Sequence, residues 1–393
     1  IANSGDTNTG LYWPAADTVG VTAGGTEVFR FGSSGDGHYG SVTGAKNMVI
    51  NGSFNVAQRG TSAITGLGGS NYEKYPTDMW MSYGTTSAAR YSASQNTPGF
   101  GSGQPRAGNG LLIDCTTVES SVAAGDVSAV LHKIEAQNVY FLQYGTNGAA
   151  TVTVSFWVSS PKTGTHTVSL YTEDTNYSCP IEYTVSSADS YELKTVTFPR
   201  PTSGATITND TGTGLWLVFP LVVGSNYQGT NNTWASGEKY GTSSSQNLMD
   251  NTSNNFKLAL VQMELGSAFT GFEHEYIGTT LNKCKRYYER ITPTGNGQPL
   301  GSGFAQSTGD AQVTLLYLEK RAIPTITGTA AGTFTIVHTG GVNAGTGSLS
   351  WDQTGTTSCR MNLAYGGSMT DGQGLQISRD ATDTTFIEIS AEL

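Results

Sequence analysis

The chain has 393 residues and a formal net charge of −10, and only 13% of its residues are charged. Because nucleic-acid binding requires clustered Lys and Arg side chains, this charge balance argues against a nucleic-acid partner. The longest apolar run, LWLVFPLVV at 215–223, is too short to cross a bilayer, so no membrane insertion is expected. The 51 Gly residues disfavour helices and favour turns, while 19 Tyr, 14 Phe and 6 Trp can build cores. The composition therefore predicts an all-β protein.

Residues 1–44 are expected to form a short fibre-like β segment. Apolar residues at 19 and 21, then at 28 and 29, fit two short strands around Gly24 and Gly25. An isolated hairpin of this size is not stable in water. It must pack on another surface, and copies of the same segment from other chains are a natural candidate.

Residues 45–278 are expected to form one large β domain, a jelly-roll sandwich of about ten strands separated by turn clusters. Alternation assigns one face of each clear strand to the core. The predicted core positions are Val152, Val154, Phe156, Val158, Val168, Leu170, Leu215, Leu217, Phe219 and Leu221. Pro220 cannot donate a hydrogen bond to a neighbouring strand, so its strand must be bulged there or lie at an edge.

A connector helix is expected at 279–292, because Leu281, Cys284, Tyr287, Tyr288 and Ile291 recur at helical spacing. Thr279 and Thr280 precede this pattern as potential N-caps. Residues 293–393 again alternate apolar and polar positions between Gly-rich turns, which predicts a small distal β-sandwich.

Catalytic and metal-binding signatures are sparse. The cysteines at 115, 179, 284 and 359 form no CxxC pair, so free buried thiols are expected rather than a zinc site. Glu273 and Glu275 flank His274, and on a strand their carboxylates would share one face at a spacing suited to inverting glycosidases. The same pattern is typical of a solvent-facing strand edge. We expect no enzyme activity.

Aromatic side chains give the candidate binding residues. On the otherwise polar faces of their strands lie Trp157, Tyr171 and Trp216, and a long polar loop carries Tyr227, Trp234 and Tyr240. Sugars stack their apolar C–H faces on aromatic rings, so these six residues are candidates for binding a glycan. Packing against a loop or a neighbouring subunit is the alternative explanation.

Several segments in a fixed order resemble a known family. These are NTGLYWPAADTVGVTAGGTEVFRFGSSG, NMVINGSFNVAQRGTS, PTDMW, HKIEAQNV, TVTVSFWVSS and LALVQMELGSAFTGFEHEYIGTTLNKCKRYYERI. Together they resemble the carbohydrate-binding-module-like jelly roll of bacteriophage tail fibres and related virion appendages. KRAIPTITGT at 320–329 resembles the distal domain that often follows. No ligand-binding residue can be transferred by motif.

The resemblance implies a virion tail-fibre or receptor-binding protein, made in the host cytoplasm and usually a homotrimer. Its expected partners are other virion tail or appendage proteins and bacterial surface polysaccharide. Modules of this family often carry a structural calcium, for which the sequence has no clear acidic cluster, and no other cofactor is expected. Two alternatives stay open, a purely structural fibre or capsid-decorating protein and a glycan depolymerase that uses Glu273 or Glu275.

Overall fold

The computed structural model describes residues 2–3, 5–14, 16, 18–32, 46–69, 73–85, 87–367, 369–380 and 385–393. Antiparallel strands dominate this part of the chain, which contains one α-helix, α1 (Ile277–Lys285). Four single turns of 3-10 helix accompany it, η1 (Ala136–Asn138), η2 (Tyr140–Leu142), η3 (Ser225–Tyr227) and η4 (Ala331–Thr333). The all-β prediction is confirmed. None of the described helices is long and apolar enough to span a bilayer.

The N-terminal unit is a four-stranded antiparallel sheet. Its strands are β1 (Ala2–Asn3), β2 (Asp6–Tyr12), β3 (Thr18–Ala23) and β4 (Thr26–Gly32). The predicted hairpin corresponds to β3 and β4, whose turn uses Gly24 and Gly25 at φ values of 59° and 80°, a region that glycine adopts readily. Trp13 remains 64% exposed next to this sheet. The unit boundary predicted at residue 44 lies outside the described residues.

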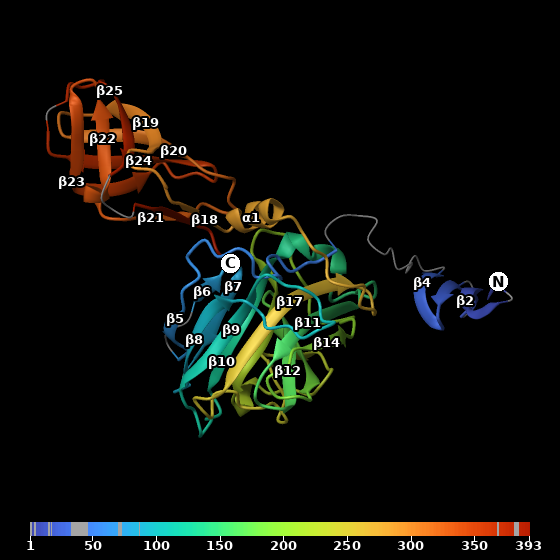
Figure 1. Cartoon of the computed structure of the whole chain (residues 1–393). Coiled ribbons are helices and arrows are strands. Elements are labelled where there is room, and N and C mark those ends of the chain that lie inside the picture. The colour runs from blue at the N-terminus through green and yellow to red at the C-terminus, as the bar shows by residue number, and fades with distance from the viewer. Residues whose placement is uncertain are drawn as a thin grey trace.

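The central unit is a sandwich of a seven-stranded and a six-stranded sheet (Figure 1). The seven-stranded sheet runs in the order β16 (Ala235–Ser236), β13 (Tyr177–Val185), β12 (Gly164–Thr172), β15 (Thr213–Val223), β10 (Val127–Glu135), β7 (Trp80–Gly84) and β6 (Lys74–Thr77). The six-stranded sheet runs in the order β14 (Glu192–Phe198), β11 (Val152–Ser159), β17 (Asn255–Leu265), β9 (Gly110–Thr117), β8 (Arg90–Asn96) and β5 (Ile64–Leu67). Consecutive strands alternate between the sheets in several places, as in a jelly roll.

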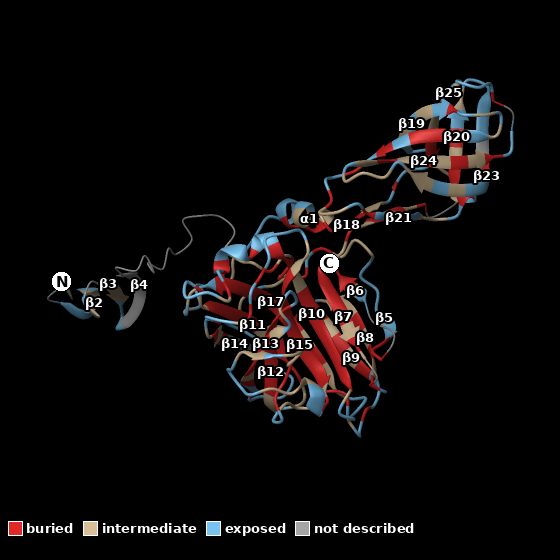
Figure 2. Ribbon diagram, turned by 180° about the vertical axis from the view of Figure 1, so that it is seen from behind, coloured by how far each residue is buried: buried red, intermediate tan, exposed pale blue. Residues whose placement is uncertain are grey.

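The sandwich core confirms the predicted strand faces. All ten predicted core positions are buried in one hydrophobic cluster between the two sheets, and Figure 2 shows the buried residues concentrated on these strands. Pro220 lies in a central strand, and the β10–β15 register shifts beside it, where Ser128 pairs with Val222 and Ala129 pairs with Pro220. The bulge is therefore the way in which this strand accommodates a residue without an N–H group.

The connector helix is shorter than predicted. It ends at Lys285, and 288–291 forms β18 (Tyr288–Ile291), which pairs with the chain's last strand, β26 (Ile387–Ser390). Tyr288 and Ile291 thus continued the helical spacing only by chance, since aromatic and β-branched residues also suit a strand. The N-cap position is Tyr276, whose carbonyl accepts from the backbone N–H groups of Thr279 and Thr280.

A small neck sheet follows the helix, in the order β18-β26-β21 (Thr325–Gly328). Two side-chain anchors attach it to the sandwich. Arg59 forms an ion pair with Glu392 at 2.8 Å, and its guanidinium lies 3.4 Å from the ring centroid of Tyr288. Arg321 donates to the carbonyl of Thr211 at 2.8 Å. The neck is therefore joined to the sandwich by more than the covalent chain.

The C-terminal unit is a closed six-stranded barrel, whereas the sequence predicted a small sandwich. Around the barrel follow β19 (Pro299–Ala305), β20 (Asp310–Leu316), β24 (Ser358–Tyr365), β23 (Gly341–Asp352), β22 (Phe334–His338) and β25 (Gly374–Arg379). The alternation is the same in both architectures, because each strand has one core face. Closure removes the exposed edges that a small sandwich would leave.

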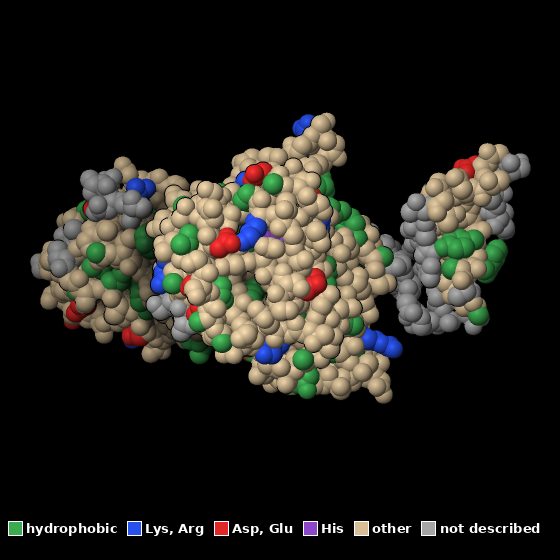
Figure 3. All heavy atoms as spheres, turned by 90° about the horizontal axis from the view of Figure 1, so that it is seen from below, with side chains coloured by type: hydrophobic (Ala, Val, Ile, Leu, Met, Phe, Trp, Pro, Cys, Tyr) green, Lys and Arg blue, Asp and Glu red, His purple; other side chains and the backbone are tan. Residues whose placement is uncertain are grey.

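The surface carries few charges. In the view from below, isolated acidic and basic side chains are scattered over an area formed by backbone and uncharged polar groups (Figure 3). This agrees with the low charged fraction of the sequence. All four cysteines are free and buried, as predicted.

Candidate functional site

The outer face of the seven-stranded sheet carries an aromatic cluster. Strand register places Trp216 on β15 directly between Tyr171 on β12 and Lys133 on β10. Tyr83 on β7 lies further across the same face, opposite Ala129 of β10. These side chains point away from the main core because the alternate residues of each strand occupy it. We call this surface the aromatic face.

A long segment between β15 and β17 covers part of the aromatic face. It brings Tyr227 and Tyr240 onto the sheet, and the two rings stack at 5.8 Å between centroids. Tyr240 in turn lies nearly parallel to Trp216 at 6.4 Å. The hydroxyl of Ser169 on β12 fixes the segment by donating to the carbonyl of Lys239 at 2.8 Å. Sheet and loop aromatics therefore form one packed group.

The members of this group differ in how much ring they leave open. Tyr240, Tyr171 and Trp216 are 0%, 6% and 7% exposed. Tyr83 and Tyr227 are half-buried at the surface of the group. Tyr83 meets Trp216 edge-on at 5.6 Å between ring centroids. The buried rings thus form a rigid base, and Tyr83 and Tyr227 offer the accessible ring surface.

Carboxylates border the rings. The indole Nε1 of Trp216 donates to Glu173 at 2.9 Å, and the hydroxyl of Tyr83 donates to Glu238 at 3.4 Å. Burial, with a smaller contribution from the nearby carboxylates of Glu238 and Glu173, raises the pKa of Tyr171 to about 12. The tyrosine therefore keeps its proton at neutral pH and offers a neutral O–H group.

Lys133 lies at the other side of Trp216. Its Nζ is 4.7 Å from the indole ring centroid and donates to the carbonyl oxygen of Leu393 at 3.0 Å. Burial lowers the pKa of Lys133, and the neighbouring Glu173 and Glu73 oppose that shift. The ammonium is thus held between an aromatic ring and the segment that returns from the barrel.

The structure separates the six predicted aromatic candidates. Tyr171, Trp216, Tyr227 and Tyr240 meet on the aromatic face. Trp157 lies on the outer face of the other sheet, edge-on to Phe100 at 5.5 Å. Trp234 packs against the main core beside Tyr144, and its Nε1 donates to the carbonyl of Pro199 at 2.6 Å. Trp157 and Trp234 are therefore not part of the aromatic face.

Sequence reasoning missed Tyr83 and Tyr75, which also lie on the aromatic face. The signal was present in WMSYG at 80–84, where Trp80 and Ser82 face inward and Met81 and Tyr83 face outward. The short strand makes that alternation easy to overlook.

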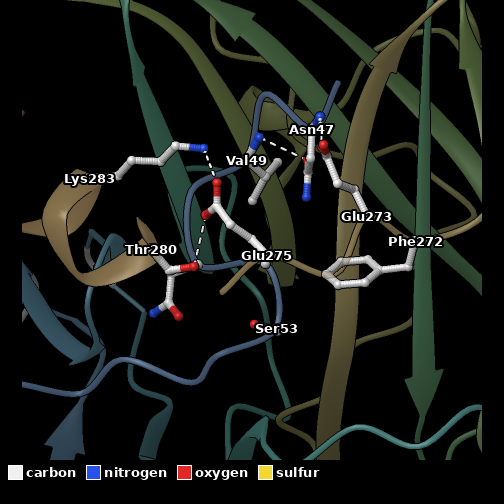
Figure 4. Close-up of a pocket in the computed structure, with 10 residues that line it drawn as sticks. Asn47, Val49, Ser53, Phe272, Glu273, Glu275, Thr280 and Lys283 are labelled. Carbon is white, nitrogen blue, oxygen red and sulfur yellow. Dashed lines mark hydrogen bonds and ion pairs between the residues drawn. The ribbon is translucent and has the colours of Figure 1, made fainter. Parts of the chain in front are cut away.

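A small polar pocket lies between the first segment of the sandwich, the segment that follows β17, and α1 (Figure 4). Its lining includes Glu273 and Glu275, which follow β17 in a segment without strand structure. Glu275 pairs with Lys283 and accepts from the hydroxyl of Thr280, while Glu273 accepts from the backbone N–H of Asn47 at 2.8 Å. These contacts indicate that both carboxylates tie segments together.

Metal binding has no obvious centre in the described part of the chain, where no group of three or more His, Cys, Asp or Glu side chains could hold an ion. A positive charge near the pocket comes from the side chain of Lys46. The Nζ of Lys46 donates to two oxygens of Thr270 and to the carbonyl of Gly271, at 3.3, 2.9 and 2.7 Å. Calcium thus gains no support from the residues described.

Comparisons with known proteins show distant structural similarity. The sequence matches no protein-family model and no curated protein. Among solved structures, the enzymatically active domain of tailspike protein 4 from Bacteriophage CBA120 is 11% identical, with a TM-score of 0.27 over 56% of this chain. The matched part spans 21% of that chain.

Two carbohydrate-related structures are similarly distant. A proposed sugar-binding protein from Bacteroides thetaiotaomicron is 11% identical, with a TM-score of 0.32 over 56% of this chain and 100% of that chain. The family 11 carbohydrate-binding module of a Clostridium thermocellum cellulase is 12% identical, with a TM-score of 0.25 over 55% and 99% of the two chains. The chain is therefore similar to carbohydrate-binding modules and to a phage tailspike domain, without a family being identified.

Proposed function

We propose that this protein binds a glycan on the aromatic face and, as part of a virion appendage, attaches the particle to bacterial surface polysaccharide. The observation that carries the binding proposal is the group of Trp216, Tyr240, Tyr227 and Tyr83, packed on one outer sheet face and bordered by Glu173 and Glu238. The resemblance of the sequence to phage tail-fibre segments supports the assignment to a virion.

The proposed binding mode follows from the exposure of each ring. A sugar lays its C–H face on the half-buried rings of Tyr83 and Tyr227, while its hydroxyls donate to Glu173 and Glu238. Trp216 and Tyr240 hold those rings in place from beneath. Because the rings are already packed, little side-chain freedom is lost on binding, which favours affinity.

We propose further that the protein acts without cleaving its ligand and assembles as a homotrimer. The N-terminal sheet supports the assembly, because Leu11 and Trp13 leave 41% and 64% of their surface exposed, which is apolar surface that neighbouring copies would cover. Three linked copies would also convert weak sugar contacts into avid attachment.

The binding proposal is tested on a glycan array with the full chain and two single variants, Tyr83→Ala and Tyr227→Ala. Each variant should weaken glycan binding by about tenfold or more, in line with the 1–3 kcal/mol by which stacked aromatics contribute to other ligands. Trp157→Ala is the matched control, because this ring lies on the opposite sheet and should leave binding unchanged. Loss of binding in the control alone would contradict the assignment of the face.

The structural-fibre alternative is favoured by one observation, the near-complete burial of Tyr171, Trp216 and Tyr240. It predicts that no glycan binds and that Tyr83 and Tyr227 become buried between chains. Light scattering gives the mass in solution, and a monomer would contradict the trimer. Release of reducing ends from bound polysaccharide, abolished by Glu273→Gln, would contradict the absence of catalysis.

A further inference from the structure

We infer that the glycan bound by the aromatic face is uncharged, and that the face selects against anionic polysaccharides. This inference rests on the proposed function and adds the chemical class of the ligand. It comes from the charged groups around the rings and from whether the structure leaves them accessible or engages them with other parts of the chain.

The carboxylates at the face are accessible. Glu173 and Glu73 are exposed, and Glu238 is half-buried. Glu173 accepts from the indole of Trp216, and Glu238 accepts from the hydroxyl of Tyr83, so both border the rings themselves. Each carboxylate oxygen has more than one acceptor position, so it can also accept from a sugar hydroxyl.

The cations at the same face are engaged within the chain. Lys133 donates to the carbonyl of Leu393 at 3.0 Å, and Lys239 donates to the carbonyl of Asn226 at 2.6 Å. Arg59 pairs with Glu392 and stacks on Tyr75 at 4.6 Å from the ring centroid. Arg321 donates to the carbonyls of Ala391 and Glu392, and to that of Thr211. Lys133 and Lys239 keep their charge and their remaining N–H donors, but each is held towards an acceptor within the chain, with which an anionic sugar would have to compete.

The two observations act in the same direction. A uronic acid, sialic acid, phosphate or sulfate group placed on the rings would meet the accessible carboxylates of Glu173 and Glu238 at short range, whereas the cations described at this face are directed to acceptors within the chain. Like charges at such distances repel, and the repulsion is strongest at low salt. An uncharged hexose or N-acetylhexosamine presents only hydroxyl and amide groups, which these carboxylates can accept from.

The experiment measures binding of the full chain to two sets of immobilised polysaccharides. Dextran, mannan and galactan are uncharged, whereas hyaluronan, polygalacturonate and polysialic acid are anionic. We expect binding to at least one uncharged polymer, and at least tenfold weaker binding to every anionic one at low salt. If the folded protein bound none of the six polysaccharides, the inference and the proposed function would both be contradicted. Tighter binding to an anionic polymer would overturn the inference alone.

Charge-removing variants separate selection by charge from selection by shape. The double variant Glu173→Gln/Glu238→Gln keeps the size of both side chains, and should strengthen binding to anionic polymers at least threefold at low salt. Glu319→Gln, which removes a charge from an exposed position at the neck, is the control and should change nothing. Lys133→Met should leave the preference for uncharged polymers intact. If Lys133→Met instead abolished binding to an anionic polymer, the lysine would be reading that charge and the inference would be wrong.

Discussion

Arg286 holds the carboxylate of Glu135 with two nitrogen atoms, Nε at 2.8 Å and Nη2 at 2.7 Å. Glu135 ends β10 in the sandwich and is fully buried, whereas Arg286 follows directly after α1. The hydroxyl of Tyr287 donates to the same carboxylate at 2.8 Å. Burial alone would raise the pKa of Glu135, but these hydrogen bonds and the charge of Arg286 outweigh burial and lower it. The pair therefore fastens the helix to the sandwich.

Replacing Arg286 should destabilise the protein strongly. Arg286→Met leaves the buried carboxylate without its counter-ion, which typically lowers the free energy of unfolding by about 3 kcal/mol. The measurement is denaturant unfolding at neutral pH. Lys283→Met is the control, because Lys283 and Glu275 form a partly exposed pair whose loss changes the free energy by less than about 1 kcal/mol. Equal effects of both variants would contradict the role of Arg286.

Stability should fall as the pH drops from about 6.5 towards 4, in part because of His132. This side chain is fully buried beside Trp80, and burial lowers its pKa from 6.5 to about 4. Between these two pH values His132 binds a proton in the unfolded chain but not in the folded protein. Proton binding therefore stabilises the unfolded state, and the free energy of unfolding falls. The full effect is about 3 kcal/mol below pH 4.

The measurement compares the native protein with His132→Gln by denaturant unfolding at pH 7.5 and pH 5. The native protein should lose more stability than the variant over this interval. His166 also has a lowered pKa and changes the stability in the same direction as His132. Burial raises the pKa values of Asp78 and Glu392, so these two carboxyl groups change the stability in the opposite direction. These groups are common to both proteins and cancel in the difference. An identical pH dependence would show that His132 does not titrate as expected.

Gly52 should not tolerate a side chain. A Cβ at this position would overlap the carbonyl oxygen of Val261, and the Gly52 carbonyl accepts from the Val261 N–H at 2.8 Å. Gly52→Ala must push the first segment away from β17, and we expect a loss of about 2 kcal/mol or more in the free energy of unfolding. Gly278→Ala is the matched control, since its Cβ meets open space in a helix and should stabilise by up to about 1 kcal/mol.

Tyr240 should matter more for stability than for ligand contact. Its ring is fully buried between Trp216 and Tyr227, so Tyr240→Ala should lower the free energy of unfolding by about 3 kcal/mol. Tyr240→Phe keeps the ring and should preserve glycan binding. Tyr276→Ala serves as the control, because Tyr276 is 89% exposed. Thermal unfolding and glycan binding, measured on the same samples, separate the two roles.

Strand faces could be predicted from the sequence because a half-buried strand repeats every two residues. This period placed Leu217 inward and Trp216 outward, and the structure agrees. The same period could not tell a barrel from a sandwich at 293–393, since both bury one face of every strand. Tyr288 misled the helix prediction because its spacing from Cys284 fits a helix, while its pairing with Ser390 depends on a strand about 100 residues away.

The candidate site was predictable only in part, and the reasons differ between its sheet residues and its loop residues. Tyr171 and Trp216 were recognised as outward-facing from alternation, and strand pairing then brought them together. Trp234 and Tyr240 lie in one irregular segment, where no period relates sequence to direction. Trp234 packs against the core, whereas Tyr240 packs on the aromatic face. Loop aromatics can therefore be identified as unusual from sequence, but their partners depend on the whole fold.

The neck has a mechanical consequence. The chain leaves the sandwich through β18 and comes back at Arg321, whose backbone N–H donates to the carbonyl of Arg286. It leaves again through β21 and returns through β26 (Figure 1). A force that pulls the barrel away from the sandwich is therefore shared by four chain segments. It also acts along strands whose ladders, β18–β26 and β21–β26, must slip in shear rather than open one bond at a time. The neck is built as a tether that resists tension.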